Sequence, residues 1–319
     1  MFLAGDIGGT KTHLAFFDHS LKMIKDKIYS SKAYDSVSLI LQDFLHGEKI
    51  QIGALGIAGP VRDGKCHATN LPWVIDEKVL SKENGNVPMF LLNDLEANAY
   101  GIPLLKEHDF VCLQKGEKGG GNRALISAGT GLGEAGIYWD GKKHIPFACE
   151  GGHADFAPRN EIEIELLTYL WDVYEHVSYE RVLSGNGFYH LYRFLVDKKG
   201  YAKNEHVESK KDPKLITEMA VANSCPTCIA TVEFFCKIYG AEAGNLALKM
   251  FASGGLYIGG GIAPKIIHFL QKKEFLESFS SKGRFSGLLQ TFPVFIIKKE
   301  ETALLGAADF ARQRGKNVS

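Results

Sequence analysis

Two similar glycine-rich segments, about 120 residues apart, constrain this chain more than any other feature. Leu3–Thr12 joins an apolar run and an aspartate to a Gly-Gly-Thr turn, and Arg123–Gly133 joins an apolar run to a Gly-Thr-Gly turn. Another apolar run follows each turn, so each segment predicts a β-hairpin. The repetition indicates a duplicated α/β fold with one hairpin in each half.

The chemistry of the two turns favours phosphate binding. Glycine lets backbone N–H groups approach an anion closely, and Thr10 and Thr12 add hydroxyl donors to the first turn. Asp6 ends the preceding strand, where a carboxylate fits beside phosphates only if a divalent cation or a water lies between them. The alternative for either turn alone is an ordinary glycine-rich hairpin, and the occurrence of two such turns favours phosphate.

The length and charge of the chain limit its class. With 319 residues it exceeds what one hydrophobic core usually supports, so we expect two domains, with a boundary near Pro103 where the pattern restarts. Lys plus Arg and Asp plus Glu both number 37, which argues against a general attraction to nucleic acid or an anionic membrane. No apolar run approaches the roughly 20 residues that span a bilayer, and no signal peptide is recognisable, so we expect a cytoplasmic location.

A polar pair follows the apolar strand predicted to begin at Val87. Asn93 and Asp94 end this strand, and a helix is predicted from Leu95. In open α/β sheets ligands bind beyond the carboxyl ends of the strands, so this pair is well placed to grip and deprotonate a hydroxyl. The alternative is that Asp94 only caps the helix.

A second group of polar residues lies in the other half of the chain. Glu150 and His153 flank two glycines in a loop, and we interpret them as ligands of a polar substrate. A zinc site is disfavoured because no HExxH motif or third ligand at a known spacing is present, and a purely structural pair is the other alternative. Glu180 lies near the start of a helix and either binds a ligand or only interacts with the helix dipole.

Three consecutive glycines, Gly259, Gly260 and Gly261, follow a β-prone run. They would let a flat ring such as a purine lie against the backbone, or they form a plain strand-to-helix turn. Cys225 and Cys228 have the spacing of a metal or redox pair, but they lie in a helical pattern and are more simply structural thiols.

The rest of the chain alternates between strand and helix patterns. A solvated loop is expected at 198–214, with a long helical region after it whose second helix opens at Pro226. Strands are expected at 23–30, 51–60 and 292–298, and helices at 37–45, 76–83, 161–174, 187–199 and 302–311.

In these motifs the chain resembles the bacterial glucokinase family, within the hexokinase and actin-like ATPase superfamily of sugar kinases. The resemblance runs over essentially the whole length and rests on six motifs in the same order. They are GDIGGT with Asp6–Thr10, ND at Asn93-Asp94, GTGLG at Gly129–Gly133, EGGHADFAP at Glu150–Pro158, ERVLSG at Glu180–Gly185 and GGGIAP at Gly259–Pro264.

The resemblance implies a fold and a domain arrangement. The fold is a two-domain, ribonuclease-H-like (actin-like ATPase) α/β fold with an active-site cleft between the domains. The smaller domain would comprise residues 1–103 plus 301–319, and the larger one 104–300. The C-terminal helix at Ala303–Arg314 would pack on the N-terminal domain.

The resemblance also implies an activity, the transfer of the ATP γ-phosphoryl group to the 6-hydroxyl of D-glucose with Mg²⁺. Asp94 would be the general base and also contact the sugar, whose other hydroxyls would be bound by Asn93, Glu150, His153 and Glu180. Asp6 would meet Mg²⁺ through water. Phosphates would contact Gly8, Gly9 and Thr10 on one side and Gly129, Thr130 and Gly131 on the other, and the adenosine would lie along Gly259, Gly260 and Gly261.

Two rival functions stay open on the sequence. One is a kinase for another hexose or an N-acylated amino sugar, and the other is a non-catalytic sugar sensor. Related repressors and kinases carry a cysteine-rich zinc motif after the loop, whereas Phe156-Ala157-Pro158 stands here, and Cys149 stands where the family pattern has glycine. We also expect a homodimer.

Overall fold

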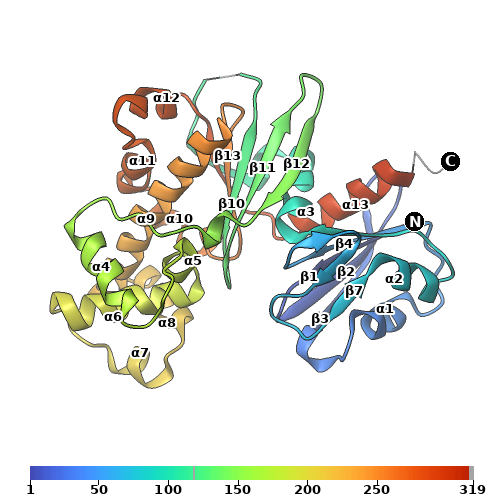
Figure 1. Ribbon diagram of the computed structural model, residues 1–319, viewed down its shortest axis with the longest axis horizontal. Helices are drawn as coiled ribbons and strands as arrows, with labels where there is room; N and C mark the ends of the chain where they lie inside the picture. Colours follow the sequence, from blue (N-terminus) through green and yellow to red (C-terminus); the bar gives the residue numbers. More distant parts are fainter. Residues whose placement is uncertain (118, 316–319) are drawn as a thin grey trace. The chain divides into compact units, whose positions relative to one another are not determined.

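The opening residues form the first predicted hairpin. In the computed structural model, which describes residues 1–117 and 119–315, β1 (Phe2–Ile7) pairs antiparallel with β2 (Lys11–Phe17). The next strand, β3 (Met23–Ser30), pairs antiparallel with β2. Strands β4 (Ile52–Ile57) and β8 (Met89–Asn93) add in parallel on the other side, giving the order β3-β2-β1-β4-β8. Figure 1 labels the first four strands of the chain in this sheet.

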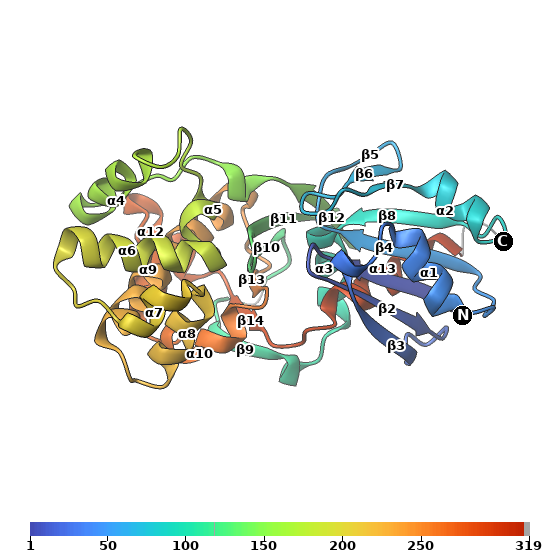
Figure 2. The same ribbon diagram turned by 90° about the horizontal axis from the view of Figure 1, so that it is seen from below.

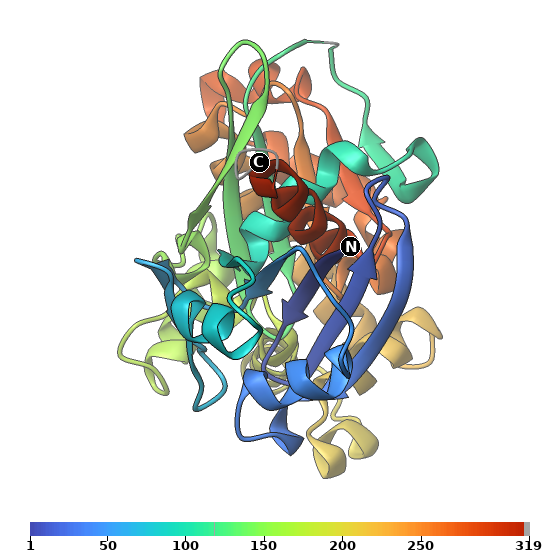
Figure 3. The same cartoon turned by 90° about the vertical axis from the view of Figure 1, so that its right-hand side faces the viewer.

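Alternate residues of these strands face opposite sides of the sheet. Both sets are apolar, so helices cover both faces. Leu3 packs in a core with helix α1 (Val37–Leu45), whereas Ala4 packs in a second core with helix α13 (Thr302–Gly315). Figure 3 shows these two helices on opposite sides of the sheet. Helix α13 also contacts helix α3 (Asp94–Gly101). The last helix of the chain therefore packs against β1 and α3, which lie in the first third of the sequence.

The second sheet repeats the strand order of the first. Strands β10 (Arg123–Ala128) and β11 (Leu132–Trp139) form the second predicted hairpin, and β13 (Leu256–Gly259) and β14 (Val294–Ile297) continue it in parallel. The full order is β12-β11-β10-β13-β14-β9, where β12 is His144–Cys149 and β9 is Phe110–Gln114. The matching order in both sheets supports the predicted duplication.

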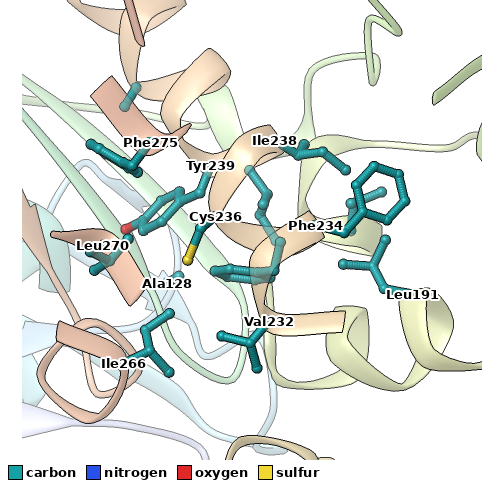
Figure 4. Packing of buried hydrophobic residues seen from close by; sticks show 14 of the residues in the cluster. Ala128, Leu191, Val232, Phe234, Cys236, Ile238, Tyr239, Ile266, Leu270 and Phe275 are labelled. Carbon is teal, nitrogen blue, oxygen red and sulfur yellow. The ribbon is translucent and has the colours of Figure 1, made fainter. Parts of the chain in front are cut away.

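Helix α9 (Pro226–Met250) organises the core beside the second sheet. It contacts α6 (Gly185–Lys199), α8 (Pro213–Val221) and α11 (Lys273–Ser280), and Figure 2 shows α6, α8 and α9 beside one another. Figure 4 shows Phe234 and Tyr239 of this helix among buried neighbours from other elements. The remaining helices are α2 (Glu77–Glu83), α4 (Glu161–Trp171), α5 (Tyr179–Val182), α7 (Glu205–Lys210), α10 (Ile267–Leu270) and α12 (Ser286–Gln290).

The chain divides into two compact units. The first comprises Met1–Glu107, the short stretch Ile145–Ala148 and the chain from Lys299 onward, and the second comprises His108–His144 and Cys149–Lys298. Over residues 1–117 and 119–315, no single helix is long and apolar enough to cross a membrane. Only α8 and α9, taken together across a sharp bend, reach that length and composition.

Some local expectations were wrong. The expected loop at 198–214 contains helix α7, because the Asn204 side chain caps it and Val207 anchors it in the core. Helix α4 ends at Trp171 rather than at residue 174. A small antiparallel sheet, β5 (Val61–Arg62), β6 (Lys65–His67) and β7 (Val74–Asp76), was not predicted, since its strands are too short for a periodic signal.

Candidate active site

The first hairpin turn is braced by a serine from outside the motif. Gly8, Gly9 and Thr10 form the turn, and the Gly8 N–H donates to the Lys11 carbonyl at 2.9 Å. The Ser31 hydroxyl donates to the Gly8 carbonyl at 2.7 Å, and the Ser31 N–H donates to the Thr10 carbonyl at 3.0 Å. The turn is therefore held in shape by residues that make no use of its outward N–H groups.

The two threonines of the turn differ in their surroundings. Thr10 is exposed, so its hydroxyl can meet a ligand. Thr12 is fully buried, and its Oγ1 lies 2.9 Å from the Ser31 Oγ. The expectation that Thr12 offers a hydroxyl to phosphate was therefore wrong, because that hydroxyl is used inside the protein. No sequence motif pointed to Ser31, since its role depends on a contact between β2 and the chain after β3.

Asp6 lies at the end of β1, opposite His13 on β2. It is half-buried, and burial raises the pKa of its carboxyl group, while the positive charges of Lys11 and His13 act in the opposite direction. Within residues 1–117 and 119–315, no hydrogen bond to this carboxylate is present. A carboxylate in this setting gains from a bound cation, and Mg²⁺ prefers one or two carboxylates together with phosphate oxygens and water. The donor type therefore fits the expected metal.

Asn93 rather than Asp94 caps helix α3. The Asn93 Oδ1 accepts hydrogen bonds from the N–H groups of Leu95 and Glu96 at 2.9 and 3.3 Å, and its Nδ2 donates to the Gly59 carbonyl at 3.2 Å. The alternative in which Asp94 only caps the helix is therefore wrong. A primary amide has two N–H donors, and in the described part of the chain one of those of Asn93 is bonded, to the Gly59 carbonyl.

Asp94 occupies the first helical position of α3. Its carboxylate is half-buried, and its Oδ1 accepts the Leu95 N–H at 3.0 Å. The positive end of the helix dipole stabilises the ionised form of a carboxylate at this position. Burial and then the charge of Asp94 raise the pKa of the nearby Cys66 thiol to about 11, so this cysteine stays a thiol at neutral pH.

The second hairpin is held by one bond within its turn and by contacts from two other segments. The Gly129 N–H donates to the Gly131 carbonyl at 2.8 Å within the turn, and the Gly185 N–H donates to the Gly129 carbonyl at 2.8 Å. The Ile262 N–H donates to the Ala128 carbonyl at 3.2 Å. The start of α6 and the loop after β13 therefore both contact this turn, in which Thr130 is exposed.

Glu180 lies directly beside this turn. It is in the first turn of α5, and its Oε2 accepts the Leu132 N–H at 3.0 Å. A side chain at Gly131 would overlap this carboxylate, so the end of the Glu180 side chain would have to move. The helix-dipole interpretation is therefore incomplete, because Glu180 also secures the base of the hairpin.

The loop that carries Glu150 and His153 is tied to the segment before Glu180. Gly151–His153 form a 3₁₀ turn, and the side chains of Glu150 and His153 are both exposed. The Tyr179 N–H donates to the Ala154 carbonyl at 3.0 Å, and nearby the Phe156 N–H donates to the Val177 carbonyl at 2.9 Å. These bonds hold the loop against the segment that precedes α5.

The three glycines after β13 have different surroundings. Gly259 ends the strand beside Ser127, and Gly260 has φ +84°, where a side chain would also overlap the Ala128 carbonyl. A Cβ at Gly261 would meet no atom within 4 Å. Gly260 is therefore required by the backbone, whereas a side chain at Gly261 would point into open space.

Cys225 and Cys228 contribute to helix α9. The Cys225 Sγ accepts the Cys228 N–H at 3.4 Å as the helix cap, and both thiols are buried. Burial, and then Cys225, raise the pKa of the Cys228 thiol to about 12. This geometry supports the structural interpretation of the pair.

Comparison with known proteins places the chain beside one family. The family model described as Glucokinase matches residues 3–314. Glucokinase from Nostoc punctiforme is 40% identical over 333 residues, covering 97% of this chain and 98% of the relative. Glucokinase from Yersinia enterocolitica is 36% identical over 318 residues, covering 98% and 96%.

Solved structures agree with this family match. A glucokinase from an Antarctic psychrotroph is 31% identical with a TM-score of 0.83, covering 98% of both chains. A ROK family glucokinase from Streptomyces griseus, in complex with glucose and AMPPNP, has a TM-score of 0.68 at 20% identity and covers 99% of both chains, so it shares the fold.

Proposed function

This chain belongs to the glucokinase family, with the actin-like ATPase fold and the ATP-dependent sugar kinase activity of that family, and we propose that Asp94 is its general base toward D-glucose. The proposal rests on the different roles of two adjacent residues at the start of α3. Asn93 caps the helix, and Asp94 follows it as a half-buried carboxylate. Asp94 would accept the proton of the glucose 6-hydroxyl as that oxygen attacks the γ-phosphorus of ATP. ADP leaves, and glucose 6-phosphate is formed.

Phosphoryl transfer requires positioning and charge neutralisation more than covalent chemistry, so a carboxylate can act as the base when the proton leaves late. The N–H groups of Gly9, Thr10, Thr130 and Gly131 would bind the phosphates, since those of Gly8 and Gly129 close their own turns. Support comes from the bracing of the two turns by Ser31 and Glu180, which preorganises each turn before ATP binds. The open space beside Gly261 supports an adenosine along Gly259–Gly261.

Mg²⁺ would be held by Asp6 through water, together with phosphate oxygens. When bound, the ion would neutralise the negative charge of the triphosphate. The support for this assignment is a half-buried carboxylate with a raised pKa and no hydrogen bond from the described residues.

Sugar selectivity would come from Asn93, Glu150, His153 and Glu180. Glu150 and His153 support this role because both are exposed on a loop that backbone hydrogen bonds fix in place. A site that pairs each polar group with a hydroxyl rejects an analogue lacking that hydroxyl by roughly 10⁴-fold or more. Such pairing favours one hexose over a broad range of sugars.

The domain division, 1–103 plus 301–319 and 104–300, is part of the same proposal, and the two compact units support it. A homodimer and a cytoplasmic location also stay predictions. Light scattering after size exclusion tests the former, and cell fractionation tests the latter.

One experiment tests the proposed acceptor. Purified protein is assayed with ATP, Mg²⁺ and a coupled readout of ADP, first with glucose and then with galactose, mannose and N-acetylated amino sugars. We expect kcat/KM to be highest for glucose. Equal values for glucose and its epimers would contradict the proposed sugar contacts, and no ADP formation with any sugar would favour a sensor.

A further inference from the structure

Two buried carboxyl groups lie below the Glu150–His153 loop. Glu134 on β11 is 1% exposed, and Glu242 on α9 is 0% exposed. In the described part of the chain, the Oε1 atom of each has no hydrogen-bond partner. Burial, and then the adjacent Glu242, raise the pKa of Glu134 to about 8. Two neighbouring carboxylates cannot both ionise cheaply in an apolar interior, so such a pair tends to retain one proton.

The cations near the pair compensate it only in part. Lys249 lies 3.6 Å from the Glu242 Oε1, but its side chain is 54% exposed and therefore well hydrated. Lys282 reaches the pair indirectly, since its Nζ donates to the Asn245 Oδ1 at 2.5 Å. Burial, and then Arg159, lower the pKa of Lys282 to about 8. Lys249 lowers the pKa of Glu134, but burial and the adjacent Glu242 outweigh it.

The other groups that face the pair are neutral. Asn245 Nδ2 donates to the Glu242 Oε2 at 2.7 Å and to the Tyr179 hydroxyl at 3.1 Å. Cys149 and Tyr239 lie within the electrostatic reach of Glu134, and burial raises the pKa of both. They contribute no charge near neutral pH.

The pair touches both segments assigned to the sugar. The Gly151 backbone lies so close to the Glu134 carboxylate that a Cβ at position 151 would overlap it. On the other side, the Asn245 amide links Glu242 to Tyr179, the residue before Glu180. Tyr179 in turn donates its N–H to Ala154 in the loop. The pair therefore contacts Gly151 directly and is linked to Tyr179 through Asn245.

We propose that Glu134 and Glu242 share one proton and act as a positioning pair, which holds the Glu150–His153 loop and the start of α5 in their sugar-binding arrangement. This inference rests on the proposed sugar contacts of Glu150 and His153. The pair does not touch the reacting atoms. It controls the affinity for sugar, because the loop rests on Glu134, and it leaves phosphoryl transfer to Asp94.

The consequence is a pH-dependent sugar affinity. Loss of the shared proton leaves two facing negative charges, whose repulsion would displace the Glu134 carboxylate from its contact with Gly151. If only the protonated form binds glucose, the apparent dissociation constant rises as the fraction of that form falls, by about tenfold from pH 7 to pH 9. The wild type is expected to show this rise in the glucose KM, with little change in kcat at saturating sugar.

The deciding experiment compares Glu134→Gln with the wild type from about pH 6.5 to pH 9. Glutamine keeps the size of the side chain and a hydrogen-bond donor toward Glu242, but it cannot ionise. The glucose KM of the variant should then vary by less than about twofold over this range. Glu242→Gln should behave alike. Glu208→Gln is the matched control, since this glutamate pairs with Arg193 in another cluster of the same unit, and it should keep the wild-type profile.

Three outcomes separate the explanations. If the rise in KM persists in Glu134→Gln and disappears in Lys282→Met, the lysine titration is responsible and the proposal is overturned. A wild-type glucose KM that stays constant with pH also overturns it. Glucose binding by calorimetry and thermal unfolding of each variant exclude a trivial folding defect. Glu150→Gln provides the separate test of the proposed sugar site, because an unchanged glucose KM there would remove the premise and leave the carboxyl pair unaffected.

Discussion

Glu180 accepts a hydrogen bond from the Leu132 N–H at 3.0 Å, so the carboxylate assigned to the sugar also secures the second hairpin. The same turn is assigned to the phosphates of ATP. A single side chain therefore links the binding of both substrates, which neither motif alone would indicate.

Replacing Glu180 should weaken both substrates together. Glu180→Gln replaces a charged acceptor by a neutral one, and hydrogen bonds to charged groups contribute about 1.5–3 kcal/mol, or roughly tenfold or more in binding. We expect the KM values for glucose and for ATP both to rise by about tenfold in steady-state assays. Glu150→Gln is the control and should raise the glucose KM alone. An unchanged ATP KM in Glu180→Gln would show that the hairpin does not depend on this bond.

Replacing Asp94 should remove turnover while keeping the fold. In Asp94→Asn the general base is lost, which costs roughly 10²–10⁴ in kcat. Glucose affinity, measured by calorimetry, should stay within several-fold, and the unfolding temperature should change little because Asn93 still caps α3. Asn93→Ala is the contrasting variant, with an expected loss of about 1 kcal/mol of stability. Near-normal kcat in Asp94→Asn would refute the assignment.

Ser31 should matter for both stability and ATP binding. Ser31→Ala removes the bond to the Gly8 carbonyl and leaves the buried Thr12 hydroxyl without its partner, which costs about 1–3 kcal/mol. We expect a lower urea midpoint and a higher KM for ATP, with the glucose KM unchanged. Ser30→Ala is the matched control, because the exposed Ser30 makes no side-chain cap bond. Equal effects of the two substitutions would argue against bracing.

Substitutions at two glycines after β13 should affect the stability of the protein and its nucleotide binding separately. Gly260→Ala places a side chain at φ +84° and against the Ala128 carbonyl, so we expect a loss on the order of 1–3 kcal/mol in denaturant unfolding. Gly261→Ala meets no protein atom and should leave stability within about 0.5 kcal/mol. If adenosine lies there, Gly261→Ala still raises the ATP KM, and an unchanged KM would remove Gly261 from the nucleotide site.

The free energy of unfolding should depend on pH because of the raised pKa of Glu134. This acid has a pKa of about 8 in the folded state against 4.5 as its reference value, so the folded form binds more protons between these limits. Stability contributed by this group is therefore present at low pH and is lost as pH rises toward 8, with a slope of at most about 1.4 kcal/mol per pH unit. Urea unfolding of Glu134→Gln and wild type at several pH values should show the variant gaining relative stability as pH increases. A constant difference would contradict the raised pKa.

A helix or strand was predictable from the sequence where the whole pattern that indicates it lies within one continuous segment. Both hairpins were confirmed, because an apolar run, a glycine turn and a second apolar run are contiguous in the chain. Strand β3 was confirmed with the expected ends. Helix α7 was missed because its charged surface imitates a solvated loop, and only the Asn204 cap and the burial of Val207 distinguish it. Strand β9 was missed because it joins the second sheet beside β14, far away in sequence.

By itself the sequence determined the kinds of site this protein can have, since glycine turns, a polar strand end and the Glu150–His153 loop are local patterns of residue type. Only the tertiary structure decided which polar groups are available to a ligand. It turned the Thr12 hydroxyl inward to Ser31, gave the helix cap to Asn93 and tied Glu180 to Leu132. It also brought Glu134 and Glu242 together from positions over 100 residues apart. Hydrogen bonds and charge pairs form between groups that are close in space, and the order of residues along the chain does not specify that proximity.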